Sequence, residues 1–161
     1  MTAVDASIVV RLLQNRAGDE RLRHRFARER YLHAPALLDA EVTSAIRGLL
    51  LASRPATRIG TAREEEMVAD YGDLPLVRHP MLPLQRRALA LRDNVTACDA
   101  FYIALAEALS MPLLTLASNL MVAFIRDAMP KRLQDRRAMH AHRNLLYAQG
   151  APMLGERGWK P

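Results

Sequence analysis

Apolar residues along this chain form two kinds of pattern. Four short apolar runs, bounded by polar residues or proline, predict strands at residues 2–6, 31–35, 74–80 and 112–116. Between these runs, apolar residues recur every three or four positions, which predicts helices over 7–14, 36–51, 81–92 and 96–109. More polar helices are expected over 18–30 and 59–71. Strands and helices therefore alternate along the chain.

This alternation predicts the fold class. Short strands that are apolar on both faces are typical of a parallel sheet covered on both sides. We therefore expect an α/β protein, a three-layer α/β/α sandwich with a short, mainly parallel central sheet. The regular pattern ends near residue 120, so we expect one domain over 1–120. Residues 121–161 are expected to be a divergent basic tail, partly helical or disordered.

The composition of the chain bears on its expected cellular location. The length of 161 residues suits one domain, and the single cysteine, Cys98, cannot form an internal disulfide, so a cytoplasmic location is the default expectation. The uncharged run 108–125 contains Pro112 and several polar residues, and we expect a buried strand with flanks rather than a membrane span.

The charge is unevenly placed along the chain. Residues 1–119 carry 15 basic and 14 acidic side chains, whereas residues 120–161 carry 8 basic and 3 acidic ones. The tail thus supplies most of the net charge of +6. Such a tail can attract a polyanion such as RNA, or it can simply be a solvated end.

Common cofactor motifs are absent from the sequence. It contains no glycine-rich dinucleotide fingerprint and no Walker motif, which ranks a small-molecule enzyme of the doubly wound class low. One cysteine and no paired histidines within a helix also disfavour zinc.

Three acidic residues stand out because of their positions. Asp5 ends the first predicted strand, Glu41 borders the apolar face of a helix, and Asp99 lies in the first turn of an apolar helix. If they converge, their mutual repulsion requires a cation, and an all-oxygen cluster suits Mg²⁺ or Mn²⁺. Each has a structural alternative: Asp5 can cap a helix, Thr96 with Asp99 fits a capping box, and Glu41 can be a rim residue.

The segments around these acids resemble a known family. They read VDASIVV at 4–10, APALLDAEVTSAIRGLL at 34–50 and LRDNVTACDAFYIALAEALSMPLLTL at 91–116. In order and spacing they resemble the three signature segments of PIN-domain ribonucleases, specifically the VapC toxins of VapBC toxin–antitoxin systems. The resemblance covers about residues 2–120.

The resemblance carries expectations about function. It implies a Mg²⁺- or Mn²⁺-dependent endoribonuclease whose catalytic and metal-binding residues are Asp5, Glu41 and Asp99, and which leaves a 3′-hydroxyl on the cut RNA. It also implies a cognate VapB-type antitoxin and a homodimer, for which the apolar helices near residues 8–13 and 36–51 offer surfaces.

Several polar residues match supporting positions of the family pattern. Ser7 and Thr96 match hydroxyl positions that could orient a ligand or water, although helix capping is the expected use of either. Asn94 matches the polar position before the third segment, where a turn role is the structural alternative. Asp39 and Asp93 match no motif position and are expected to be surface acids.

The sequence departs from the family after the last strand. The family usually continues with an acid where this chain has Ala117, and Asn119 offers only a neutral oxygen nearby. Four explanations are open: natural loss, a deliberate alanine substitution, a frame change near the end of the gene, or a rearranged site. Losing one oxygen ligand is expected to weaken metal binding. The alternative function is a weak or inactive PIN-fold module that binds an antitoxin or RNA.

Overall fold

The computed structural model describes residues 1–116, and within them four strands form one parallel sheet. In chain order the strands are β1 (Thr2–Val4), β2 (Leu32–Pro35), β3 (Leu76–His79) and β4 (Leu113–Leu114). From one edge of the sheet to the other, their order is β3-β2-β1-β4. β1 pairs with both β2 and β4 in parallel. Ala117, Asn119 and the expected tail over 121–161 lie outside the described residues.

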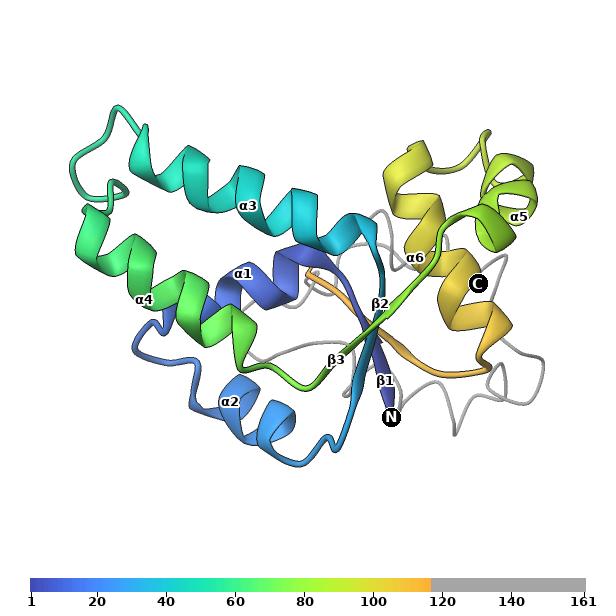
Figure 1. The fold of residues 1–161 in the computed structure, drawn as a ribbon, viewed down its shortest axis with the longest axis horizontal. Helices are drawn as coiled ribbons and strands as arrows, with labels where there is room; N and C mark the ends of the chain where they lie inside the picture. Colours follow the sequence, from blue (N-terminus) through green and yellow to red (C-terminus); the bar gives the residue numbers. More distant parts are fainter. Residues whose placement is uncertain (117–161) are drawn as a thin grey trace, which may run out of the picture.

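Helices connect the strands, as parallel pairing requires. They are α1 (Ala6–Gln14), α2 (Glu20–Ala27), α3 (Leu37–Leu50), α4 (Thr61–Gly72), α5 (Gln85–Ala90) and α6 (Ala97–Ala108). Figure 1 shows α1 to α4 on one side of the strands and α5 and α6 on the other. The predicted α/β fold, a short parallel sheet flanked by helices, is therefore confirmed.

Most predicted boundaries lie within a few residues of those observed, and two differences bear on the fold. The helix expected over 81–92 begins as a 3₁₀ turn, Leu82–Leu84, and continues as the short α5, Gln85–Ala90; 3₁₀ turns are frequent at the start of α-helices. The first strand ends at Val4 and not beyond Asp5, since Asp5 caps α1.

The core lies between the sheet and its helices. α6 contacts β1 and β2, while α1 contacts α3 and α4. The most deeply buried apolar side chains come from strands and from both helical layers, and they include Val4, Ile8, Leu38, Ile103 and Leu113. Within the described part of the chain, no helix has the length and apolar character needed to cross a membrane.

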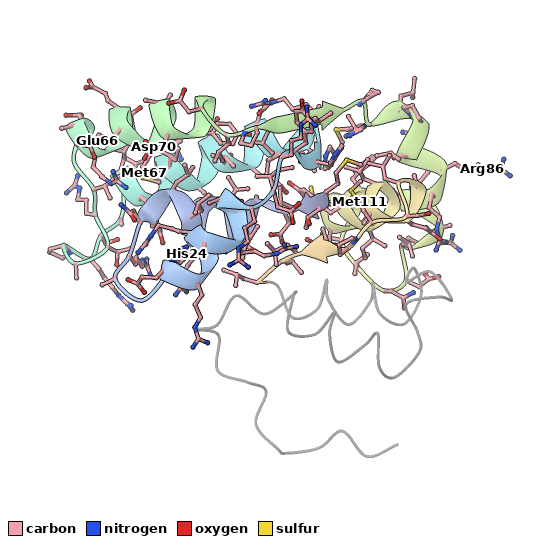
Figure 2. The ribbon with its side chains drawn as sticks, turned by 90° about the horizontal axis from the view of Figure 1, so that it is seen from below. His24, Glu66, Met67, Asp70, Arg86 and Met111 are labelled. Atoms are coloured by element: carbon pink, nitrogen blue, oxygen red, sulfur yellow. The ribbon has the colours of Figure 1, made fainter. Side chains whose placement is uncertain are left out.

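Helix α4 shows how the residue pattern decides which face is buried. Met67 is 1% exposed, whereas its neighbours Glu66 and Asp70 on the same helix are exposed (Figure 2). Arg63, Glu64 and Tyr71, which lie three or four positions from Met67, are half-buried, so only a narrow stripe of α4 contacts the core.

The strand order creates a natural binding position. The chain leaves β1 toward β2 and β3 on one side and returns to β4 on the other side. In open parallel sheets, ligands bind at such a switch point, beyond the carboxyl ends of the strands. Asp5 follows β1 and Thr115 follows β4, so both lie at this edge.

Candidate active site

Asp5 has two structural roles at the end of β1. It is the N-cap of α1, where its Oδ1 accepts a hydrogen bond of 3.1 Å from the Ile8 N–H. It is also only 4% exposed. The capping alternative considered for Asp5 is therefore real, but a cap does not need to be buried, and burial of a carboxylate requires further partners.

Two hydroxyl groups supply those partners. Ser7 Oγ donates to Asp5 Oδ1 at 2.8 Å, and Thr115 Oγ1 donates to Asp5 Oδ2 at 2.5 Å. The Leu116 N–H donates to Ser7 Oγ at 3.0 Å, which ties the end of β4 to the start of α1. The expectation that Ser7 caps a helix is wrong, because Asp5 occupies the N-cap and Ser7 lies inside α1.

The electrostatic environment of Asp5 is unfavourable for its charge. Burial raises the pKa of Asp5, and the negative charge of Asp99 raises it further. The hydrogen bonds from Thr115, Ser7 and Ile8 lower this pKa, but they do not offset the burial. A cation beside Asp5 would offset the remaining penalty.

Glu41 is held by a tyrosine from another helix. It lies half-buried on α3, and the Tyr102 hydroxyl of α6 donates a hydrogen bond to Glu41 Oε2. Tyr102 is 2% exposed; this burial, together with the Glu41 bond, raises the pKa of Tyr102 far above its usual range. Glu41 is therefore tied to α6 through one of its two carboxylate oxygens.

Asp99 lies in the first turn of α6 and is half-buried. Its N–H donates to Thr96 Oγ1 at 3.2 Å, which makes Thr96 the N-cap of the helix, as expected. Asn94 lies in the preceding turn, where its N–H donates to the Leu91 carbonyl at 3.0 Å. Thr96 and Asn94 do not line the pocket that contains Asp99.

The three acids share one pocket of about 510 Å³ at the carboxyl end of β1. Its lining residues come from the β1–α1 junction, α3 and α6, and they are Asp5, Ala6, Ser7, Leu37, Ala40, Glu41, Ser44, Asp99 and Tyr102. Among residues 1–116, no three acidic, histidine or cysteine side chains form a ready-made metal cluster. Mutual repulsion between carboxylates opposes such a cluster when no cation is present.

The donor chemistry of the pocket fits a hard divalent cation. Carboxylate and hydroxyl groups offer oxygen donors, which Mg²⁺ and Mn²⁺ prefer. Asp5, which is buried, and Glu41 and Asp99, which are half-buried, could each contribute an oxygen ligand to such an ion. The burial of Asp5 in a pocket that it shares with Glu41 and Asp99 is the observation that points to a cation.

Comparison with known proteins identifies the family. The family model of the PIN domain matches residues 2–120. The chain belongs to the PIN domain family. The resemblance and the fold class expected from the sequence are thereby confirmed.

Curated relatives of this PIN domain carry ribonuclease names. Ribonuclease VapC9 of Mycobacterium tuberculosis is 39% identical over 115 residues, covering 71% of this chain and 84% of the relative. Ribonuclease VapC12 of the same species is 35% identical over 115 residues, covering 71% and 85%. Ribonuclease VapC1 is 38% identical over 124 residues, covering 74% and 88%.

Two other acids of the PIN domain lie outside the pocket. Asp39 Oδ1 accepts hydrogen bonds from Tyr71 at 2.6 Å and from Arg78 Nε at 2.8 Å. Burial opposes ionisation of Asp39, but these two donors together hold its pKa below the usual range. Asp93 is exposed and lies 3.8 Å from Arg92. Neither acid lines the pocket, in line with their expected place at the surface.

Two residues of the site were not anticipated from the sequence. Tyr102 and Thr115 touch Glu41 and Asp5, respectively, although neither carries a charge or matches a metal-ligand pattern. The sequence contained an indication of each residue's place in the site. Tyr102 follows Asp99 by three positions on one helix, and Thr115 directly follows a buried strand, where ligand-binding side chains gather.

Replacing Thr115 with valine tests the hydrogen bond that Thr115 donates to Asp5. Thr115→Val removes the donor to Oδ2 and is expected to lower the free energy of unfolding by about 1–3 kcal/mol at pH 7, because a buried acceptor loses its partner. The loss should be smaller at pH 4 than at pH 7, because burial raises the pKa of Asp5 and protonation weakens its need for a hydrogen-bond donor. Urea denaturation at both pH values measures it.

Thr43→Val is the matched control for this substitution. The Thr43 hydroxyl donates to the backbone carbonyl of Asp39 on an exposed part of α3. The expected change is within about 0.5 kcal/mol, with no dependence on pH. Equal effects of the two substitutions would contradict a special role for Thr115.

Proposed function

We propose that this PIN domain is the toxin component of a type II toxin–antitoxin system and acts as a metal-dependent endoribonuclease. The observation that carries the proposal is the shared pocket of Asp5, Glu41 and Asp99, which are contributed by three separate elements of the fold. The ribonuclease names of its relatives support the substrate class.

The residues have distinct tasks in this proposal. Asp5 is an immobile ligand, because Ser7 and Thr115 restrain its two carboxylate oxygens. Glu41 and Asp99 complete the oxygen donor set. A bound Mg²⁺ or Mn²⁺ supplies charge neutralisation at the RNA phosphate and acidifies the attacking water. Water adds to phosphorus while the P–O3′ bond breaks, and the leaving oxygen takes up a proton to become the 3′-hydroxyl.

The proposed partners follow from family membership. A VapB-type antitoxin would inhibit the enzyme by covering the pocket, and a homodimer would form through the apolar helices near residues 8–13 and 36–51. The cytoplasm, where RNA and the antitoxin are made, is the proposed location.

A metal titration tests the proposal. Mn²⁺ added to the purified full chain is expected to raise the thermal unfolding temperature, because an ion that binds only the folded state stabilises it. Mn²⁺ should also support cleavage of single-stranded RNA, and EDTA should stop it. A chain that shows neither response would contradict the enzymatic proposal.

The alternative function is a weak or inactive PIN-fold module that binds an antitoxin or RNA. Ala117, in place of the family's fourth acid, is the observation that favours it. Asn119 is proposed to offer a neutral oxygen in compensation.

Ala117→Asp separates the two functions. Restoring an acid is expected to tighten Mn²⁺ binding and to raise the cleavage rate about tenfold, the scale on which auxiliary groups affect metal sites. The Mn²⁺ dependence of RNA cleavage measures both effects. Ala117→Asn is the control for side-chain size and should give a smaller change. RNA binding without cleavage in all variants would support the inactive module.

A further inference from the structure

Tyr102 belongs to the pocket without being an expected ligand. It lies on α6, three residues after Asp99, and is buried to 2% exposure. Its hydroxyl donates to Glu41 Oε2, although the two residues are 61 positions apart in the chain. The bond therefore joins α3 and α6, two of the elements that contribute acids to the pocket.

We propose that Tyr102 is a positioning residue that orients the Glu41 carboxylate for binding a divalent cation. This inference rests on the proposed metal-dependent function. Tyr102 acts through Glu41 and does not itself hold the ion.

The geometry gives the physical reason. A glutamate side chain has three rotatable torsions, and fixing them opposes ligand binding with conformational entropy. The Tyr102 hydroxyl restrains one oxygen, Oε2, and leaves Oε1 for another ligand. The ring is immobile because it is fully buried in the core. A rigid donor behind a metal-binding carboxylate typically affects metal affinity by 10- to 100-fold.

A second hydrogen bond between a tyrosine and an acid of α3 provides an internal control. Tyr71, on α4, donates its hydroxyl to Asp39 Oδ1 of α3 at 2.6 Å. Asp39 lies two positions before Glu41, and neither Tyr71 nor Asp39 lines the pocket. Tyr71→Phe therefore removes the same kind of tyrosine–carboxylate hydrogen bond to α3 without touching the candidate ligands.

Calorimetric titration of the full chain with Mn²⁺ tests the inference. Tyr102→Phe is expected to raise the dissociation constant for Mn²⁺ about tenfold. Tyr71→Phe is expected to leave it within about twofold of the wild-type value. In cleavage assays, Tyr102→Phe should raise the Mn²⁺ concentration needed for half-maximal rate while largely preserving the rate at saturating Mn²⁺. A purely structural role would affect unfolding in urea but not this concentration.

A second pair of variants tests whether the effect passes through Glu41. In a Glu41→Gln background, adding Tyr102→Phe should change Mn²⁺ affinity far less than it does in the wild type, because the restrained carboxylate is already gone. Additive effects would overturn the inference.

The possible results separate this inference from the proposed function. Unchanged or tighter Mn²⁺ binding by Tyr102→Phe, with normal binding by the wild type, overturns the role of Tyr102 alone. Absence of Mn²⁺ binding by the wild type overturns both the positioning role and the metal-dependent function.

Discussion

Asp5→Asn is expected to lower kcat/KM for RNA cleavage by about 100- to 1,000-fold, which corresponds to about 3–4 kcal/mol of transition-state stabilisation. Asparagine preserves the size of the side chain, and its amide can donate to the Thr115 hydroxyl, so the fold should persist. The negative charge that would hold a cation is lost. RNA cleavage and the thermal response to Mn²⁺ measure the two consequences.

The stability of the metal-free protein provides a second measure of Asp5. Because the folded state raises the pKa of Asp5 above its usual value of 3.8, the folded state keeps this proton at a higher pH than the unfolded chain. This contribution to stability is fully present below pH 3.8 and is lost as the pH rises through the folded-state pKa. Urea denaturation in EDTA should show this decline in the wild type and a flatter profile in Asp5→Asn.

Asp93→Asn is the matched control for this experiment. It removes a carboxylate that is 78% exposed and lies outside the pocket. Cleavage, the Mn²⁺ response and the pH profile should all match those of the wild type. Full activity of Asp5→Asn, or equal losses in the two variants, would rule out Asp5 as a ligand.

Ile103→Ala is expected to lower the free energy of unfolding by about 2–5 kcal/mol. Ile103 is 0% exposed on the face of α6 that contributes to the core. Truncation removes apolar burial and leaves a cavity that the surrounding strands and helices can fill only in part. Urea denaturation in EDTA measures the change without any contribution from metal binding.

Leu89→Ala serves as the comparison, because Leu89 on α5 is 58% exposed. Its expected effect is within about 0.5 kcal/mol. Since α6 also carries Asp99 and Tyr102, the folded fraction of Ile103→Ala should still bind Mn²⁺. A loss below about 1 kcal/mol would contradict the position of Ile103 in the core.

Much of the fold could be predicted from the sequence because its signals are local. Short apolar runs bounded by proline or polar residues indicated all four strands, and helical spacing indicated the helices. The error at 81–92 arose because apolar spacing does not distinguish a 3₁₀ turn from the α-helix that follows it. The cap at Thr96 was also predicted, and a turn was the structural alternative for Asn94, since a cap and a turn depend only on neighbouring residues.

The candidate site was predictable only in part. Asp5, Glu41 and Asp99 were recognised through their charge and the family resemblance, and their role as ligands stays a prediction. Only the expected capping use of Ser7 was wrong, because its hydroxyl donates to Asp5 and accepts from the backbone N–H of Leu116, which is 109 positions away. A pattern of neighbouring residues cannot indicate a contact between residues so far apart in the chain.

The sequence by itself determined the order and type of the secondary-structure elements and supplied the acids that mark the chain as a PIN domain. The tertiary structure alone decided that those acids share one pocket, that Thr115 restrains Asp5 and that Tyr102 restrains Glu41. The two hydrogen bonds join residues 110 and 61 positions apart. They exist because parallel strand pairing and core packing bring distant segments together, and that placement depends on the whole chain rather than on any short stretch of it.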